Sequence, residues 1–131
     1  MGQITHGVMF GCKYPKFPKG TTWDGDSVKK GDEWVYQKGL ADIYKSPSGA
    51  CLRLDEEYNV IGFCIAVGAS GEDGCPDLRG PIDMAAFDAD KRYAKATRRA
   101  RDAWAHLAAF FAEHGVKHEE PRLWLVELEV A

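Results

Sequence analysis

The longest regular pattern of hydrophobic and polar positions lies between residues 88 and 115. At the α-helical period, apolar side chains fall on one face of this segment and cationic side chains on the opposite face. The apolar face consists of Tyr93, Ala96, Ala100, Trp104, Leu107 and Phe111, and the cationic face of Lys91, Lys95, Arg98 and Arg99. Asp88 or Asp90 provides an N-cap, and Gly115 is suited to end the helix. The pattern predicts one long helix with a solvated cationic side.

Short apolar runs elsewhere predict strands. Residues 3–11 alternate, with Ile4, His6, Val8 and Phe10 on one face, which implies that His6 is buried. Residues 50–54 and 59–67 predict two strands joined by a turn. The second of these is apolar at both parities, as expected of a strand that is covered on both faces or lies at the centre of a sheet.

The last strand and one ambiguous segment complete the pattern. Residues 122–130 alternate, and Glu127 and Glu129 share one face, which suits an edge strand because charge discourages unwanted pairing. Residues 32–45 show apolar positions near the helical period and predict a helix. A short strand at 34–36, which reads Trp-Val-Tyr, is the alternative.

The resulting order is β-α-β-β-α-β, the ferredoxin-like split βαβ arrangement. We therefore expect the α+β class: a two-layer sandwich in which an antiparallel four-stranded sheet packs against the long helix and a shorter helix. Strands 3–11 and 59–67 would be central, and strand 122–130 would lie at an edge. With 131 residues, the chain is predicted to form a single globular domain over residues 1–131. This arrangement supports many unrelated activities and names none of them.

Charge and cysteine content narrow the class of protein. The net charge is −3, but residues 88–101 carry six cations and two carboxylates, so this segment is +4 and the remainder is −7. A mildly acidic chain with one basic stripe does not resemble a general nucleic-acid binder. The four cysteines form no C-x-x-C pair, and the sequence has neither a signal-peptide pattern nor an apolar run of membrane-spanning length. We expect a cytoplasmic protein with reduced thiols.

The preferred recognition surface is the aromatic and basic loop 13–23. Its candidate binding residues are Lys13, Tyr14, Lys16, Phe17 and Trp23, to which Arg98 and Arg99 on the long helix are added. Cations interleaved with aromatic rings can neutralise phosphates and stack bases. In the alternative interpretation, Tyr14 and Phe17 pack onto the core while the lysines reach into solvent.

A weaker enzymatic interpretation places a site near loop 68–77. Either Cys75 would be a nucleophile, or Asp73 and Asp77 would be metal ligands or acid-base groups, with His6 as a pocket residue. The alternative is an ordinary polar turn, because no cation near Cys75 in the sequence would lower the pKa of its thiol. No spacing of Cys and His residues matches a zinc site, and no cofactor-binding or common catalytic motif is present, so neither a metal nor a cofactor is expected.

Three functions remain open. The first is a small non-catalytic binding protein that engages a partner protein or a small anionic ligand through loop 13–23 and the basic helix face. The second is a small hydrolase or transferase with a site near loop 68–77. The third is a nucleic-acid-binding accessory protein, which the charge balance does not favour. A homodimer, formed through the edge strand or through an alanine-lined part of the long helix, is compatible with all three.

Overall fold

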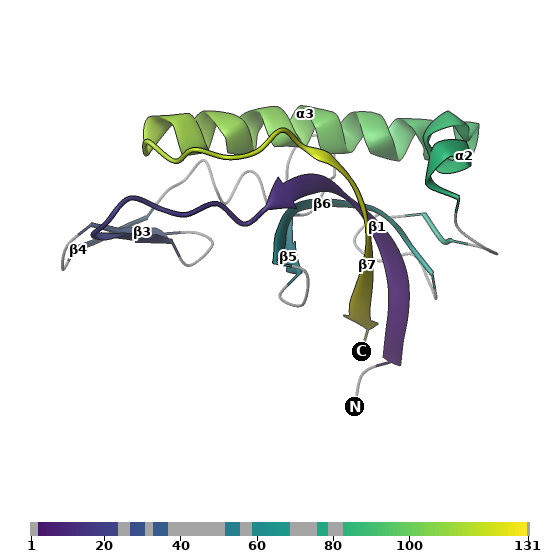
Figure 1. Cartoon of the computed structure of the whole chain (residues 1–131), viewed down its shortest axis with the longest axis horizontal. Coiled ribbons are helices and arrows are strands. Elements are labelled where there is room, and N and C mark those ends of the chain that lie inside the picture. Colours follow the sequence, from purple (N-terminus) through teal and green to yellow (C-terminus); the bar gives the residue numbers. More distant parts are fainter. Residues whose placement is uncertain are drawn as a thin grey trace.

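The computed structural model describes residues 3–23, 27–30, 33–36, 52–55, 59–68, 76–78 and 83–130 (Figure 1). In chain order its elements are β1 (Gln3–Lys13), β2 (Thr21–Trp23), β3 (Ser27–Lys30), β4 (Glu33–Tyr36), β5 (Leu52–Asp55), β6 (Val60–Val67), α2 (Met84–Ala89), α3 (Lys91–Glu113) and β7 (Arg122–Val130). The strands form two sheets. One has four strands in the order β5-β6-β1-β7, and the other has three in the order β2-β3-β4.

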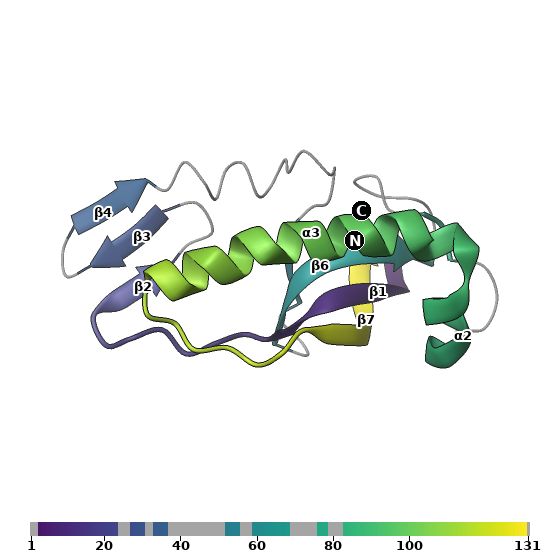
Figure 2. The same cartoon turned by 90° about the horizontal axis from the view of Figure 1, so that it is seen from above.

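The four-stranded sheet is the framework of the molecule. All its neighbouring strands are antiparallel, with β1 and β6 in the centre and β7 at one edge. The pairing of β1 with β6 shifts register between Val8 and Met9, which is an irregularity of the bulge type. Helix α3 lies across one face of this sheet, where it packs mainly on β6 and to a smaller extent on β1 (Figures 1 and 2).

The predicted β-α-β-β-α-β order is wrong, and the ferredoxin-like fold class is wrong with it. Between β1 and β5 the described residues form the antiparallel three-stranded sheet β2-β3-β4, which the predicted order does not contain. Residues 33–36 within the predicted helix 32–45 are strand β4; the other residues of that prediction lie outside the described ones. The class is still α+β, with one long and one short helix among the described residues.

The physical reason for the error is the pairing of β4 with β3. Val28 lies opposite Val35, and Lys29 lies opposite Trp34. Bulky aromatic and β-branched residues fit a pleated sheet well, and the hydrogen bonds of the ladder decide between strand and helix when the apolar spacing permits both. The partner strand β3 shows little apolar pattern and could not be recognised from the sequence. The helical spacing of apolar residues over 32–45 was then the stronger signal, and it favoured the wrong element.

The main core lies between α3 and the sheet. From β1 and β6 it includes Val8, Phe10, Cys12, Ile61, Phe63 and Ile65, and from α3 it includes Ala100, Ala103, Trp104, Leu107 and Phe111. A smaller cluster on the other side of the sheet contains Met9, Val60, Cys64, Val67 and Val126. All eight residues of β6 are buried, which confirms the prediction of a central strand covered on both faces.

The long helix is confirmed within a few residues of its predicted ends. The Asp90 side chain accepts a hydrogen bond from the Arg92 amide at 2.9 Å and caps the N-terminus of α3. At the other end Gly115 has a φ of +68°, and the Val116 amide donates to the Phe111 carbonyl at 2.8 Å. Within the described part of the chain, no helix is both long and apolar enough to span a bilayer.

Candidate functional site

The segment 13–20, called the lysine segment below, leaves the end of β1 and separates its side chains into two groups. The Lys13, Lys16 and Lys19 side chains are exposed, whereas those of Tyr14 and Phe17 are half-buried. The Tyr14 and Phe17 rings stack with their centroids 6.1 Å apart, and Phe17 meets Phe111 of α3 edge-on at 6.2 Å. The aromatic side chains therefore fix the segment to the core, and the lysines reach solvent.

Backbone contacts hold the same segment at both ends. The Tyr14 amide donates to the Asn59 carbonyl at 2.7 Å, and the Thr21 amide donates to the Pro18 carbonyl at 3.0 Å. The turn that follows requires Gly20, whose φ is +84°. Burial raises the pKa of the Tyr14 hydroxyl above its ordinary value. The segment is thus anchored at its start, its middle and its end.

The lysines recur at every third position, in the sequence Lys-Tyr-Pro-Lys-Phe-Pro-Lys. In a proline-rich extended chain with three residues per turn, every third side chain projects from the same side at intervals of about 9 Å. The three lysines are exposed and the two aromatic residues are half-buried, as this period requires, whereas Pro15 is buried and Pro18 is exposed. Lys13 is the last residue of β1 and Lys19 lies in the turn that follows, so the three exposed lysines lie along a segment that is held at both ends.

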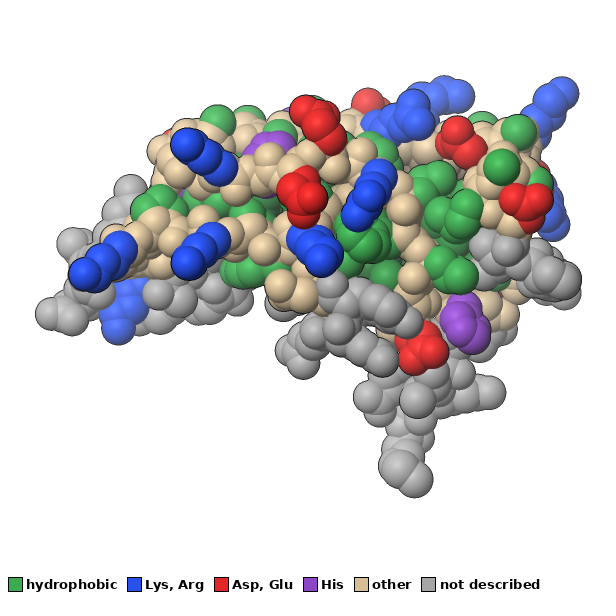
Figure 3. All heavy atoms as spheres, in the orientation of Figure 1, with side chains coloured by type: hydrophobic (Ala, Val, Ile, Leu, Met, Phe, Trp, Pro, Cys, Tyr) green, Lys and Arg blue, Asp and Glu red, His purple; other side chains and the backbone are tan. Residues whose placement is uncertain are grey.

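A second extended segment, residues 116–121, runs beside the lysine segment between α3 and β7 (Figures 1 and 2). It adds the exposed Lys117 as well as the exposed carboxylates of Glu119 and Glu120. Figure 3 shows Lys and Arg side chains spaced along this part of the surface, with acidic side chains between them and the helix. The row of lysines is therefore a local cationic strip beside acidic groups, and not part of a broad basic face.

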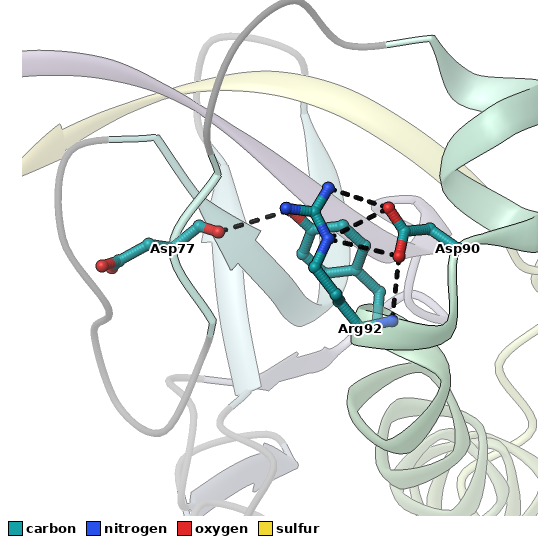
Figure 4. A network of polar contacts seen from close by, with 4 residues as sticks. Asp77, Asp90 and Arg92 are labelled. Carbon is teal, nitrogen blue, oxygen red and sulfur yellow. Dashed lines mark hydrogen bonds and ion pairs between the residues drawn. The ribbon is translucent and has the colours of Figure 1, made fainter.

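The cations of α3 form a separate group in its N-terminal half. Lys91, Lys95 and Arg98 are exposed, and Arg99 is half-buried. Two further arginines are engaged within the protein. The Arg92 Nη2 atom lies 2.8 Å from Asp90 Oδ2, as drawn in Figure 4, and Arg101 lies 4.0 Å from Asp88 with its guanidinium 5.8 Å from the centroid of the Phe10 ring.

The structure does not bring the two predicted cationic surfaces together. The lysine segment contacts α3 at Phe111, which is 13 residues beyond Arg98 along the helix. At the rise of an α-helix, this separation corresponds to roughly 20 Å. Arg98 and Arg99 therefore belong to another part of the surface, and the side chain of Trp23 lies outside the described ones.

The expectation that His6 is buried is wrong. Its side chain is 62 % exposed, and Nε2 lies 4.0 Å from Glu127 Oε1 of the neighbouring strand. His6 does alternate with the buried Val8 and Phe10, but toward its N-terminal end β1 bends away from the helix that covers those residues (Figure 1). Alternation predicts which face a side chain is on, and the distance of the covering element from that face decides whether the side chain is buried.

The proposed catalytic groups do not form a site among the described residues. Asp73 and Cys75 lie outside them, and at the described start of that loop the His6 carbonyl accepts a hydrogen bond from the Gly68 amide at 2.7 Å. At the loop's end, the Tyr93 hydroxyl donates to the Asp77 carbonyl at 3.3 Å (Figure 4). In the part of the chain that is described, no group of three His, Cys, Asp or Glu side chains could hold a metal ion.

Cys12 is the described cysteine nearest to the lysine segment. Its side chain is buried, and burial raises the pKa of its thiol from 9.0 to about 11. The thiolate is the nucleophilic form of cysteine, and it is a very small fraction at neutral pH when the pKa is this high. His6 and Cys12 also lie six residues apart on β1, about 20 Å along a strand. Cys12 is therefore poorly suited to act as a nucleophile at neutral pH, and it lies far from His6 along the strand.

Comparison with known protein families, with curated proteins and with solved structures found no match to this chain.

Two features of this region were not foreseen from the sequence. His118 lies beside Trp104 and Phe111, with ring centroids 5.6 Å and 5.4 Å away, so it extends the aromatic cluster that supports the lysine segment. Phe111 itself was assigned to the core face, but its role as the contact for Phe17 was not predicted. The repeat of the lysines and aromatic residues at every third position was the available signal, because it separates the two kinds of side chain.

Proposed function

We propose that this chain is a small, non-catalytic binding protein that engages an acidic partner protein through Lys13, Lys16 and Lys19. The observation that supports this most directly is the fixed row of exposed lysines, supported from below by the contact of Phe17 with Phe111. An already ordered segment loses less conformational entropy on binding than a mobile loop, so more of the electrostatic attraction is retained as affinity.

An acidic protein segment fits this strip better than nucleic acid does. Base stacking requires an aromatic face that is available to the ligand. The rings of Tyr14 and Phe17 are stacked on each other, and Phe17 is packed on the core. The buried, reduced thiols of Cys12 and Cys64 support a cytoplasmic setting.

The test compares two variants that remove the same charge. In the first, Lys13, Lys16 and Lys19 are changed to glutamine; in the second, Lys91, Lys95 and Arg98 on the outer side of α3 are changed to glutamine. A fluorescently labelled polyglutamate peptide serves as the acidic probe, and an oligothymidylate of similar charge serves as the nucleic-acid probe. Fluorescence anisotropy at a fixed, near-physiological salt concentration gives the dissociation constant for each.

We expect polyglutamate to bind the wild type and the helix variant with similar affinity. The variant that lacks Lys13, Lys16 and Lys19 should bind polyglutamate at least about tenfold more weakly, because three directed charge contacts are lost. An equal loss in both variants would mean that only net charge matters and would refute the proposed site. Tighter binding of oligothymidylate than of polyglutamate would favour the nucleic-acid alternative.

A further inference from the structure

His118 lies beside the lysine segment, and the two share one aromatic support. The His118 ring centroid is 5.4 Å from that of Phe111, and the ring of Phe17 meets the same Phe111 at 6.2 Å. The rings of His118 and Phe17 are therefore separated by no more than the sum of these two distances, which is close to the screening length of about 10 Å at 0.1 M salt. The segment 116–121, which carries His118, runs along the lysine segment in Figures 1 and 2. A charge on this imidazole would thus act on the same ligand as the lysines.

The contacts of the His118 ring leave one nitrogen to take up a proton. Nδ1 lies 2.8 Å from the Glu119 carbonyl oxygen. A carbonyl oxygen only accepts, so Nδ1 carries the hydrogen, and Nε2 is the basic nitrogen of the neutral ring. The α3 side chains that the ring contacts, Trp104 and Phe111, are uncharged and lie within the distance at which an aromatic ring attracts a cation. The residue is exposed, so a protonated ring keeps these contacts and also reaches water.

The ionisable groups around His118 respond differently to pH. Its own segment adds the exposed Lys117, Glu119 and Glu120, and side chains of these types ordinarily titrate outside the range from about pH 5 to 8. On β1 and the lysine segment, burial raises the pKa of the Cys12 thiol to about 11 and the pKa of the Tyr14 hydroxyl above its ordinary value. Both groups therefore stay neutral in that range, in which histidine gains its charge.

We propose that protonation of His118 adds a cation beside Lys13, Lys16 and Lys19 and strengthens the attraction of this surface for an acidic partner below neutral pH. The inference rests on the proposed function, because it concerns the same surface. Histidine is neutral at the upper end of its titration range and charged at the lower end, so affinity should rise as the pH falls. By linkage, binding of the acidic partner should in turn favour the protonated ring.

The experiment measures the dissociation constant of a fluorescently labelled polyaspartate peptide by fluorescence anisotropy at about pH 5.5 and at about pH 7.5, where aspartate side chains are ionised. The result for each protein is the gain in affinity between the higher and the lower pH. This gain should be at least about threefold larger in the wild type than in His118→Gln. The control His106→Gln removes an exposed histidine from α3 and should keep the gain of the wild type. Equal gains in the wild type and His118→Gln would overturn the inference.

The variant His118→Arg tests the same charge by adding it permanently, and it does not depend on how well His118→Gln folds. Arginine stays charged throughout this pH range, and its planar guanidinium packs on aromatic rings. At about pH 7.5 this variant should bind polyaspartate at least about threefold more tightly than the wild type does. An affinity equal to that of the wild type would contradict the inference.

Failure of the proposed function gives a different result. If changing Lys13, Lys16 and Lys19 to glutamine leaves the affinity for polyaspartate unchanged at both pH values, the lysine segment is not the binding surface, and the inference fails with it. If the affinity depends on these lysines but the gain at low pH does not depend on His118, the proposed function stands and only the inference is refuted.

Discussion

Gly11 of β1 and Gly62 of β6 lie opposite each other at a point where the two central strands are too close for a side chain. A Cβ atom added to Gly11 would lie 2.7 Å from the Gly62 Cα and in contact with the Ile61 carbonyl oxygen. Both obstacles are backbone atoms of a buried strand, which cannot move aside as the end of a flexible side chain can. The pair therefore sets the spacing of the two strands on which the main core rests.

Changing Gly11 to alanine should lower the free energy of unfolding by at least about 2 kcal/mol, because the strands must separate or bend to admit the methyl group. Urea denaturation followed by circular dichroism measures the loss. Gly20→Ala is the control. Its surroundings are open, so only the positive φ of +84° opposes alanine, at a cost of about 1 kcal/mol. A smaller loss for Gly11→Ala than for Gly20→Ala would contradict the close approach of β1 and β6.

Replacing Trp124 with phenylalanine should destabilise the sheet edge by about 1–2 kcal/mol. The indole Nε1 donates to the Gly11 carbonyl at 2.8 Å, and phenylalanine cannot make this bond. Arg122→Gln is the matched variant, because it removes only the guanidinium that lies 4.3 Å from the Trp124 ring centroid and should cost less than about 1 kcal/mol. The same denaturation experiment gives both values, and their order is the critical result.

Phe17→Ala should lower stability by about 1–2 kcal/mol, because the ring contacts both Tyr14 and Phe111. Lys16→Ala should leave stability within about 0.5 kcal/mol, since that side chain is exposed. Thermal denaturation by differential scanning calorimetry separates the two. Equal midpoints for the two variants would mean that the lysine segment is not fixed by its aromatic residues.

The stability of the protein should fall as the pH rises from about 9 to about 11. The Cys12 thiol has its pKa raised to about 11 by burial, so the folded state favours the protonated thiol and loses this advantage as the unfolded chain ionises first. Tyr14, whose pKa burial also raises, acts in the same direction. Cys12→Ala should flatten part of this decline in denaturation experiments at several pH values, and an unchanged profile would argue against a buried thiol.

Asp90→Ala should lower the thermal midpoint more than Asp90→Asn, because asparagine retains an oxygen that can cap α3 whereas alanine does not. The hydrogen bond from the Arg92 side chain lowers the pKa of the Asp90 carboxyl below 3.8. Its stabilising effect is therefore present above that pH and declines as the pH falls through the lowered pKa. Asp90→Asn should lack this acid-dependent component, which thermal denaturation between neutral and acidic pH detects.

The parts of the fold that could be predicted are those set by local chemistry. Helix α3 carries its own apolar period, its cap at Asp90 and its ending at Gly115, so its extent was predicted within a few residues. The strand at 60–67 was recognised because it is apolar at both parities. The strand at 33–36 was predicted to be helical because its partner strand, β3, could not be recognised from the sequence. Lys29 and Lys30 of β3 give that segment no alternating apolar pattern.

The candidate site shows the same division. The lysines and aromatic residues of the segment 13–20 were identified from the sequence, together with the two arrangements that they could adopt. Which arrangement holds depends on Phe111, almost a hundred residues away in the chain, and no local pattern reports that contact. Likewise, the exposure of His6 depends on where α3 lies over the sheet, which is decided by tertiary packing.

The contact between Phe17 and Phe111 links recognition to the last turns of α3. A ligand that binds the lysine segment only while Phe17 packs on Phe111 also favours the state in which the last turns of the helix are folded. By linkage, binding should then slow hydrogen exchange of the Phe110 to Glu113 amides, although none of these residues would touch the ligand. Slower exchange at the end of the helix would thus indicate that the lysine segment is bound, although the helix lies on the opposite side of that segment from the ligand.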